Sequence, residues 1–364
     1  MTTAAASTIR WGILGCGNVT EVKSGPAFQK AEGSALQAVM RRRGDLAADY
    51  ARRHGVPSWT DDAGTLIADP TVDAVYVATP PGAHESLALA VCAARKPAYV
   101  EKPMARNHAE CQRMIAAFAA AGVPLFVAYY RRALPRFVRA RDLVAAGELG
   151  TITGVSTRLS GPYHRDVVAG VQAGTPLPWR LQAEHAGGGL LLDLGCHTLD
   201  ILDFICGPLE AVRGAAANLG TPCAVEDTVA LTFRAGGGAL GTAQWLFAAA
   251  ERADEIVISG ERAELRLSTF GNEPVELRRG DRVDRFDLPN PPHIQQPMIQ
   301  SIVDELRGPG TCASTGVSAA RTSAIVDTVL LDYYGTRADG FWRTPETWPG
   351  NRARRPGSGD LKKQ

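Results

Sequence analysis

The sequence predicts an α/β protein: an N-terminal doubly wound parallel sheet, followed by an α+β domain with a large, mainly antiparallel open sheet. Two observations carry this prediction. In the first third of the chain, short apolar stretches alternate with segments of helix length, the order that builds parallel strands covered by helices. Beyond about residue 130, strand-like stretches are joined by tight polar or glycine-rich turns, which indicate antiparallel pairing.

Five short apolar stretches are the expected parallel strands: 9–15, 35–39, 72–80, 98–101 and 125–130. The stretch at 72–80 is apolar at nearly every position, as expected when helices cover both faces of a parallel sheet. Helices are expected between the strands. Gly55 and Gly122 are typical of helix C-termini, and Asn107 followed by Glu110 is typical of a helix start.

The hairpin strands of the second part are expected within 151–160, 227–247, 254–268 and 274–288. Two helices, near 189–206 and 316–334, are expected to cover one face of that sheet. We place the two domains at 1–128 and 129–345. The Pro- and Arg-rich stretch 346–364 is interpreted as a C-terminal tail.

The composition excludes several classes of protein. The chain has 364 residues, and its formal net charge of +1 gives no electrostatic case for binding nucleic acid or an anionic membrane. Seven scattered cysteines without a C-x-x-C pair are typical of reduced thiols. The start of the chain lacks the basic and apolar regions of a signal peptide. The most apolar stretch, 116–130, is broken by Gly122 and Pro124, so we expect a cytoplasmic protein without a membrane span.

A glycine pair follows the first expected strand. In GILGCGNVT, Gly15 and Gly17 allow a tight turn and the close approach of a diphosphate, and Asn18 and Val19 lead into a helix. Thr20 stands where the third glycine of a dinucleotide-binding fingerprint belongs. Glycine pairs also form purely structural turns, but the position directly after the first strand favours a dinucleotide site.

Arginines stand at the end of the second expected strand, AVMRRRGD. An acid at this point would bind the adenosine ribose of NAD. Arg41 and Arg42 instead offer guanidinium groups, which suit a ribose 2′-phosphate; the alternative is a solvated basic loop. We predict NADP as the cofactor, with NAD as the second choice.

The strand at 72–80 runs into ATPPGAHES. Thr79 and Pro80 are expected at the cofactor cleft, which lies beyond the carboxyl ends of the strands. His84 opens the following helix. It either faces that cleft or is a capping or surface residue, and the sequence leaves both interpretations open.

The segment GGGLLLDLGCHTLDIL, residues 187–202, carries the strongest constellation of polar groups. If it is helical, Asp193, His197 and Asp200 share one face. An acid one turn before a histidine can hold the imidazole in one tautomer and raise its basicity. The alternatives are an exposed polar stripe or a zinc site, and no further ligands at suitable spacing support zinc. We therefore expect acid–base chemistry and no metal.

The stretch AYVEKPMA ends an apolar strand with Glu101, Lys102 and Pro103. A strand that enters a core has little reason to end on an acid, a base and a ring without an N–H donor. Either this is a solvated strand end, or the charges serve a ligand at the carboxyl edge of the sheet.

The segments GCGN, EKPM, YYRRALP and GGGLLLDLGCHTLD, in this order, resemble the glucose–fructose oxidoreductase and inositol dehydrogenase family (Gfo/Idh/MocA). The resemblance covers nearly the whole chain. It implies an N-terminal Rossmann domain, a C-terminal domain with a large open sheet, and a nicotinamide cofactor between them. Glu101, Lys102 and Pro103 match the E-K-P motif of the family, and Asp193 and His197 match its D-x-x-x-H motif.

The resemblance also implies roles for these residues. Lys102 polarises the reacting oxygen, and the Lys102–Pro103 bond is cis. His197 takes the hydroxyl proton while Asp193 orients the imidazole, so the predicted catalytic residues are Lys102, Asp193 and His197. Cofactor contacts are expected from Gly15, Gly17, Asn18, Val19, Arg41, Arg42, Thr79, Pro80, His84, Glu101, Lys102 and Arg131. Substrate contacts are expected from Lys102, Tyr163, Trp179, Arg180, Asp193 and His197.

The predicted reaction is hydride transfer between NADP(H) and a secondary alcohol of a sugar, cyclitol or related polyol. One alternative is an enzyme that keeps its cofactor bound through an internal redox cycle, including a glycosidase-like cycle. The other is a non-enzymatic ligand sensor, which would normally lack the three catalytic residues.

The second domain also predicts self-association. Only one face of its sheet has helices to cover it, and we interpret VALTF, AQWLF and EIVIS as placing large apolar side chains on the other face. We expect a homodimer or homotetramer that packs through strands between about 227 and 288, which is also what the family resemblance implies.

Overall fold

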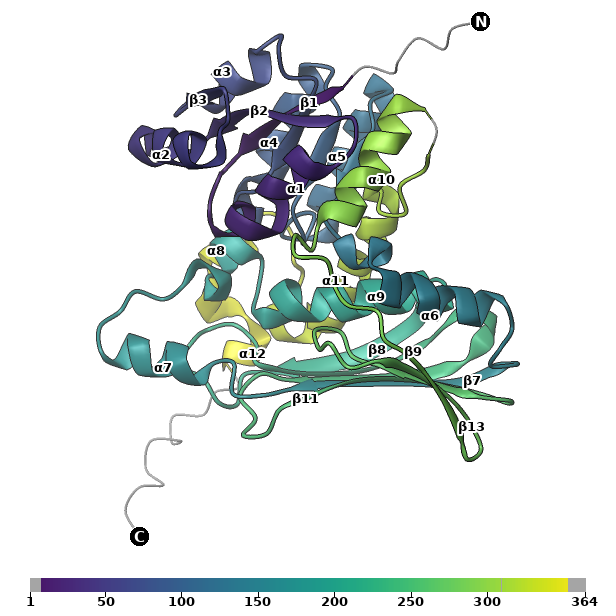
Figure 1. Cartoon of the computed structure of the whole chain (residues 1–364). Coiled ribbons are helices and arrows are strands. Elements are labelled where there is room, and N and C mark those ends of the chain that lie inside the picture. Colours follow the sequence, from purple (N-terminus) through teal and green to yellow (C-terminus); the bar gives the residue numbers. More distant parts are fainter. Residues whose placement is uncertain (1–7, 309, 353–364) are drawn as a thin grey trace, which may run out of the picture.

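The computed structural model describes residues 8–308 and 310–352, and it contains one sheet in each half of the molecule (Figure 1). Six parallel strands form the first sheet, in the order β3-β2-β1-β4-β5-β6. The strands are β1 Ile9–Leu14, β2 Ser34–Met40, β3 Ser58–Thr60, β4 Ala74–Val77, β5 Ala98–Val100 and β6 Leu125–Val127. The chain reverses its direction across the sheet between β1 and β4, so their carboxyl ends flank the usual ligand crevice of such sheets.

Helices connect these strands as predicted. They are α1 Gly25–Lys30, α2 Gly44–His54, α3 Ala63–Ala68, α4 His84–Ala93 and α5 His108–Ala121, with a π-helical turn at Thr20–Ser24 before α1. Helix α2 ends at Gly55 and α5 at Gly122, both in the left-handed conformation. The Asn107 side chain accepts a hydrogen bond from the Glu110 amide at 2.8 Å and so caps α5. The edge strand β3 and helix α3 were not predicted, because each is very short.

The second sheet has eight strands in the order β14-β13-β12-β11-β7-β10-β9-β8. Only β7 and β10 pair in parallel, so the sheet is mixed and mainly antiparallel, as predicted. The strands are β7 Ile152–Ser160, β8 Glu210–Ala217, β9 Thr228–Arg234, β10 Leu240–Leu246, β11 Ala253–Gly260, β12 Glu264–Leu267, β13 Val275–Arg279 and β14 Arg282–Phe286.

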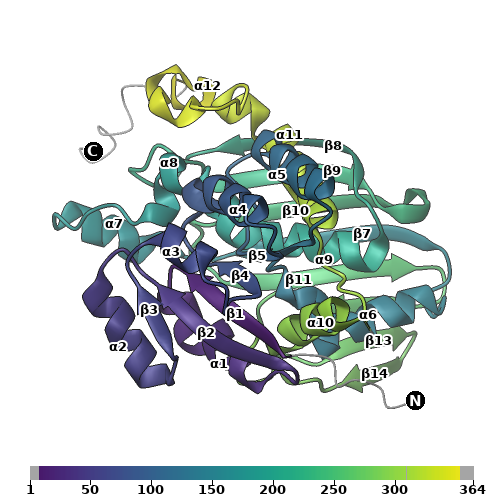
Figure 2. The same cartoon turned by 90° about the horizontal axis from the view of Figure 1, so that it is seen from above.

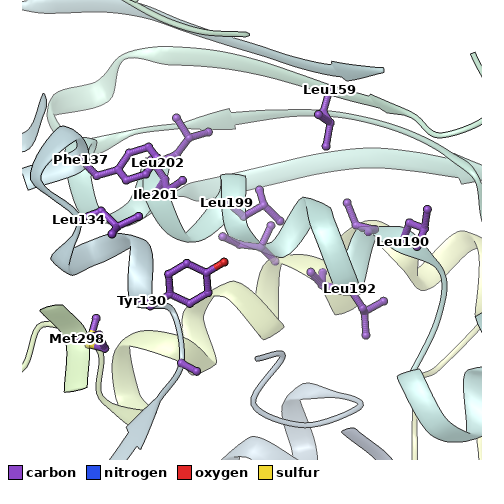
Figure 3. Packing of buried hydrophobic residues seen from close by; sticks show 14 of the residues in the cluster. Tyr130, Leu134, Phe137, Leu159, Leu190, Leu192, Leu199, Ile201, Leu202 and Met298 are labelled. Atoms are coloured by element: carbon purple, nitrogen blue, oxygen red, sulfur yellow. The ribbon is translucent and has the colours of Figure 1, made fainter. Parts of the chain in front are cut away.

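Helices cover one face of this sheet and leave the other open (Figure 1). The helices of the second half are α6 Pro135–Ala145, α7 Arg165–Gln172, α8 Ala183–Ala186, α9 Cys196–Cys206, α10 Gln296–Arg307, α11 Gly316–Tyr334 and α12 Pro349–Arg352. Figure 3 shows Leu199 and Leu202 of α9 packed between Phe137 of α6 and Leu159 of β7, in the middle of the apolar core.

The prediction that large apolar side chains line the open face is wrong. Along β9, Val229, Leu231 and Phe233 are buried, while the residues between them are exposed. Trp245 of β10 and Ile256 of β11 are likewise fully buried. Side chains alternate across a strand, so these apolar side chains turn towards the helices, although Leu240 of β10 is 62% exposed on the open face.

The predicted C-terminal tail begins too early. Trp348 is only 2% exposed and stacks edge-on against Tyr334 at 4.6 Å between ring centroids, so this part of 346–364 is packed on the domain. Residues 353–364 lie outside the described part of the chain.

The two halves share an apolar boundary. Helix α10 packs against α1 and β1, and α11 packs against α5 as well as β8 and α9 (Figure 2). Gln295, in the segment that joins β14 to α10, is fully buried and accepts a hydrogen bond from Tyr99 of β5. Within 8–308 and 310–352, no helix combines the length and apolarity needed to cross a membrane.

Candidate active site

The glycine turn after β1 is shaped to admit a ligand. Gly15 has φ 91°, a conformation that disfavours any side chain, and a Cβ there would also meet Thr79 Cγ2 at 2.9 Å. Gly17 is different: the nearest atom to a Cβ there is the Gly15 carbonyl oxygen at 3.8 Å. The protein itself therefore leaves room above Gly17, which suits the close approach of a diphosphate. Asn18 is exposed beside this space and Val19 is half-buried.

The missing third glycine has a substitute further along. Thr20 is buried; its hydroxyl donates to the Gly17 carbonyl at 2.8 Å, and its own carbonyl accepts from the Tyr50 hydroxyl at 2.8 Å. A π-helical turn follows, and Gly25 then packs so closely that a Cβ would clash with Tyr50 Oη and the Thr20 carbonyl oxygen. Close packing is the usual task of the third glycine, and here Gly25 performs it.

The three arginines after β2 have different partners. Arg43 forms an ion pair with Asp45 at 2.6 Å. Arg41 makes a single long contact, 3.5 Å from Nη1 to the Cys16 carbonyl, and Arg42 is exposed. Neither Arg41 nor Arg42 has an ion pair among the described residues, so both guanidinium groups are available beside the glycine turn.

His84 does not lie at the surface of the cleft. It is fully buried, with Nδ1 3.0 Å from the Pro103 carbonyl and Nε2 2.7 Å from the Thr79 carbonyl. Burial lowers the pKa of His84. The imidazole joins the segments that follow β4 and β5, so its contribution is to hold Thr79 and Pro80 at the edge of the sheet, and both interpretations offered by the sequence are replaced.

Glu101 is anchored by hydrogen bonds inside the protein. The Tyr76 hydroxyl donates to its carboxylate at 2.6 Å, Gln295 Nε2 at 2.7 Å and the Lys102 backbone amide at 3.0 Å. Tyr99 in turn donates to Gln295 at 3.0 Å. The acid that ends β5 therefore fixes the backbone that presents Lys102, and it is only 6% exposed.

Lys102 and Asp193 form the central pair of the site. Lys102 Nζ lies 2.7 Å from Asp193 Oδ1 and 2.7 Å from the Asp193 carbonyl oxygen. Burial disfavours the charged ammonium, but the Asp193 carboxylate outweighs it, and the pKa of Lys102 is raised. Burial would raise the pKa of Asp193, and Lys102 reverses this and lowers it. Both groups are charged, and the Lys102–Pro103 bond is cis, as the family resemblance implied.

Asp193 is not the orienting partner of His197. Its second oxygen pairs with Arg180 Nε at 3.2 Å, and no hydrogen bond joins it to His197 among the described residues. The reason is local: Leu191–Gly195 form a π-helical turn before α9, which changes the spacing that an α-helix would give. The sequence prediction assumed an uninterrupted α-helix.

Asp200, the third member of the predicted stripe, also has another partner. Arg132 donates to its carboxylate at 2.8, 2.9 and 3.0 Å, and both side chains are almost fully buried. Arg132 also pairs with Asp203 at 2.9 Å. Asp200 therefore connects α9 to the segment after β6, and it does not face the cleft with Asp193.

His197 is held by aromatic rings. It is 4% exposed and lies edge-on to Tyr129, Tyr130 and Phe270, at 6.2, 5.5 and 5.8 Å between centroids. Its Nδ1 is buried with no hydrogen-bond partner in the described chain, which leaves Nε2 as the nitrogen that can meet a substrate.

Burial is the main cause that lowers the pKa of His197 well below its ordinary value, and the positive charges of Arg131, Lys102 and Lys23 act in the same direction. The prediction that an acid raises the basicity of His197 is wrong. The imidazole is neutral near pH 7, as a proton acceptor has to be.

Arg131 lies beneath the site rather than at the cofactor turn. It is 5% exposed, and its guanidinium group sits 4.5 Å from the Phe270 ring centroid and 5.0 Å from that of Tyr130. Nε donates to the Thr269 carbonyl at 3.0 Å and Nη1 to the Tyr130 hydroxyl at 2.9 Å. These are the same two rings that flank His197, which explains why its charge acts on the imidazole.

Trp179 and Arg180 lie beside Asp193. The Arg180 guanidinium stacks 4.5 Å from the Trp179 ring centroid while it contacts Asp193. Tyr163 is further from these groups: it packs against Phe247 at 6.0 Å and below Arg252 at 5.2 Å. The structure therefore brings Lys102, Arg180, Asp193 and His197 together, and leaves Tyr163 at the periphery.

Two residues of the site were missed from the sequence. Gln295 donates a hydrogen bond to Glu101, and the positive charge of Lys23 acts to lower the pKa values of both Asp193 and His197. Each is an isolated polar residue in a stretch without a motif, so only the fold reveals its position. Among the described residues, no group of three His, Cys, Asp or Glu side chains is arranged to hold a metal ion.

Comparisons with known proteins agree with this geometry. Residues 9–129 match the model of an oxidoreductase family with an NAD-binding Rossmann fold, and residues 137–266 match the GFO/IDH/MocA C-terminal domain. Oxidoreductase P35 of Formosa agariphila is 34% identical over 321 residues, which cover 88% of this chain and 98% of that protein. Levoglucosan dehydrogenase of Pseudarthrobacter phenanthrenivorans is 31% identical over 55% of this chain and 56% of its own length.

Solved structures share the fold. A levoglucosan dehydrogenase in complex with NADH and levoglucosan superposes with a TM-score of 0.76 at 22% identity, over 88% of this chain and 96% of the other. An oxidoreductase from Agrobacterium radiobacter in complex with NAD⁺, L-tartaric acid and magnesium has a TM-score of 0.78 at 22% identity, over 92% and 97%. Both domains, their order and the residues at their junction lead to one conclusion: the chain belongs to the GFO/IDH/MocA family of NAD(P)-dependent oxidoreductases.

Proposed function

We propose that this protein is a dehydrogenase that reversibly oxidises a secondary alcohol of a sugar, cyclitol or related polyol with NADP(H). The observation that carries the proposal is the Lys102–Asp193 ion pair at 2.7 Å, formed beside a neutral, buried His197 at the carboxyl edge of the parallel sheet. Relatives named levoglucosan dehydrogenase, 1,5-anhydro-D-fructose reductase and myo-inositol 2-dehydrogenase support the substrate class.

Lys102 has one donor to spare. An ammonium group carries three N–H donors, and the carboxylate and carbonyl oxygens of Asp193 accept two of them. The third can donate to the substrate oxygen and stabilise the negative charge that develops on it. Because Asp193 keeps Lys102 charged, Lys102 acts as a polarising donor and does not remove the proton.

His197 is the proton acceptor of the proposal. Its low pKa keeps the imidazole neutral, and in this proposal Nδ1 carries the ring proton, so the hydroxyl proton moves to Nε2 as the carbonyl forms. A bound nicotinamide supplies the acceptor for the hydride that leaves the same carbon. Trp179 and Arg180 close one side of the cleft, and the stacked pair restricts the access of water.

The test is single-turnover hydride transfer with a panel of sugars and polyols, followed by nicotinamide absorbance. Lys102→Ala and His197→Asn should each slow the transfer by about 10²–10⁴-fold, the usual contribution of a positioned donor or base. Circular dichroism and denaturation curves check that each variant is folded. Transfer at the wild-type rate in either folded variant would contradict the role given to that residue.

We also propose NADP as the preferred cofactor. No acid follows β2 directly, and Arg41 and Arg42 lie beside the glycine turn without ion pairs in the described chain. A charge-assisted contact to a 2′-phosphate contributes about 1.5–3 kcal/mol, or roughly tenfold to a hundredfold in affinity. Arg41 is the main contact in this proposal, and Arg42 stacks on the adenine.

Arg41→Asp tests this choice, and the chain offers Arg43→Asn as a matched control because Arg43 is already paired with Asp45. The ratio of kcat/KM for NADP to that for NAD should fall at least tenfold in Arg41→Asp and stay within about twofold in the control. A wild-type enzyme that prefers NAD, or a ratio that Arg41→Asp leaves unchanged, would refute the assignment.

The proposal includes a cytoplasmic homo-oligomer. All seven cysteines are buried free thiols, which suits a reducing compartment. The open sheet face carries small side chains at its centre, including Ala215, Ala230, Thr232 and Thr242, around a hollow of about 700 Å³. Small side chains let a second sheet approach closely, so the open face is the proposed contact between subunits.

A further inference from the structure

Positive charge exceeds negative charge at the site. Lys23, Lys102, Arg131 and Arg180 are basic, and the acids near them are Asp193, Glu101 and Asp254, which accepts from the amides of Thr269 and Phe270 next to Arg131. Asp193 is shared between Lys102 and Arg180. The Glu101 carboxylate accepts hydrogen bonds from Tyr76, Gln295 and a backbone amide. Four positive charges therefore face three carboxylates, and one positive charge is in excess.

Arg180 has donors that the protein does not use. Only its Nε contacts Asp193, and neither terminal nitrogen has a hydrogen-bond acceptor among the residues described. The stack on Trp179 fixes the plane of the guanidinium group at 4.5 Å, while half of the side chain stays exposed. A planar, fixed and unoccupied pair of N–H donors is the geometry that binds a carboxylate through both oxygens.

Arg131 and Lys23 add to the demand for an anion. Arg131 is 5% exposed, and its hydrogen-bond acceptors among the described residues are a carbonyl and a phenol, neither of which carries charge. A buried cation without a counter-ion is costly. Lys23 is exposed and has no ion pair in the described chain, yet its charge reaches both Asp193 and His197.

We propose that the substrate is an acidic sugar, such as a uronate or aldonate, whose carboxylate binds the free donors of Arg180 with help from Lys23. This inference rests on the proposed function and names its substrate class. The carboxylate supplies the missing counter-charge, while the hydroxyl to be oxidised meets Lys102 and His197. A neutral sugar leaves the terminal nitrogens of Arg180 without a charged acceptor.

The test is calorimetric titration of the enzyme–NADPH complex with D-glucuronate, D-galacturonate, D-gluconate and D-galactonate. The matched probes are the methyl esters of the two uronates, which keep the shape and remove the charge, and the corresponding neutral hexoses. At least one acid should bind tenfold to a hundredfold more tightly than its uncharged counterpart, the range of a charge-assisted contact. Its affinity should fall as salt is raised, and that of the ester should not.

Arg180→Gln should remove most of this preference, and Lys23→Gln should reduce it. Arg282→Gln, at a 74%-exposed arginine on the β13–β14 hairpin, is the control and should keep it. Equal binding of acid and ester, absence of binding by every acid, or a preference retained in Arg180→Gln would each overturn the inference.

Nicotinamide absorbance separates this inference from the proposed function. Turnover of neutral sugars without preference for acids would leave the dehydrogenase standing and remove the carboxylate site. Selective binding of an acid with no hydride transfer to or from any compound would leave the carboxylate site standing and remove the dehydrogenase.

Discussion

Individual side chains set the charge state of His197. Arg131 shares its two flanking rings, Tyr130 and Phe270, with the imidazole. Together with burial, its charge disfavours protonation of His197. A base with a lowered pKa is free to accept a proton at every pH above that pKa, so an acid limb in activity lies below the ordinary histidine range.

We therefore expect kcat/KM for alcohol oxidation to stay level as the pH falls through 6.5. In Arg131→Gln one opposing charge is gone, so the pKa of His197 rises and the acid limb moves to higher pH. Arg141→Gln, on the surface of α6 and paired with Asp142, should leave the profile where it is. A wild-type limb at 6.5 or above, or a limb that Arg131→Gln does not move, would contradict this account.

Among the elements, the turn from β1 to α1 contains one glycine that packing requires and one that ligand binding favours. Gly25 is required by the protein itself, because a Cβ would clash with Tyr50 and the Thr20 carbonyl. Gly17 has no such neighbour, and a ligand that approaches the backbone is what favours glycine there.

Gly25→Ala should lower the free energy of unfolding by about 1–3 kcal/mol, the usual cost of overpacking. Gly17→Ala should leave it within about 0.5 kcal/mol and instead raise the KM for the cofactor at least tenfold. Urea denaturation and cofactor titration of both variants measure the two effects. The reverse pattern would show that Gly17 is the packing glycine.

In the whole molecule, three buried histidines link stability to pH. Burial lowers the pKa values of His84, His164 and His197 in the folded state, while the unfolded chain binds protons near 6.5. Between these values the unfolded state holds more protons, so stability rises with pH there and is lost as the pH falls below about 6.5.

The urea midpoint should therefore be lower at pH 5.5 than at pH 7.5. His164 stacks on Phe247 and neither of its ring nitrogens has a partner in the described chain, so His164→Phe removes one titrating group with little change in packing. The midpoint of that variant should depend less steeply on pH. An unchanged dependence would exclude His164 from the linkage.

Self-association is also a property of the whole molecule. If the open sheet face is the contact, wild-type protein should sediment as a dimer or larger at micromolar concentration. Thr242→Glu, at the centre of that face and paired across the strands with Thr232 and Ser156, should dissociate it. Thr328→Glu, exposed on α11, should not. A monomeric wild type at these concentrations would refute the predicted oligomer.

The sequence predicted most elements and the segments that meet at the candidate site, because strand alternation, helix caps and the two motifs are local signals. Lys102 and His197 follow from such signals. The partner of Asp193 does not, because a π-helical turn replaces the assumed α-helix. Gln295 comes from a segment about 190 residues away from Glu101, and no short-range pattern indicates such a contact. The open face was misjudged because the apolar side chains of VALTF were assigned to it, and alternation alone does not tell which face of the strand meets the helices.

The late position of α10 and α11 in the sequence has a consequence for folding during synthesis. The six parallel strands are complete by Val127, yet two of the covering elements, Gln296–Arg307 and Gly316–Tyr334, are synthesised only after the whole second sheet. Val127 is hydrogen-bonded to Ser314 twice. Its amide donates to the Ser314 carbonyl, and the Ser314 hydroxyl donates to the Val127 carbonyl. A nascent N-terminal half therefore emerges with part of its apolar surface bare and the Glu101 carboxylate lacking Gln295, and it completes its own fold only after α10 and α11 have been synthesised.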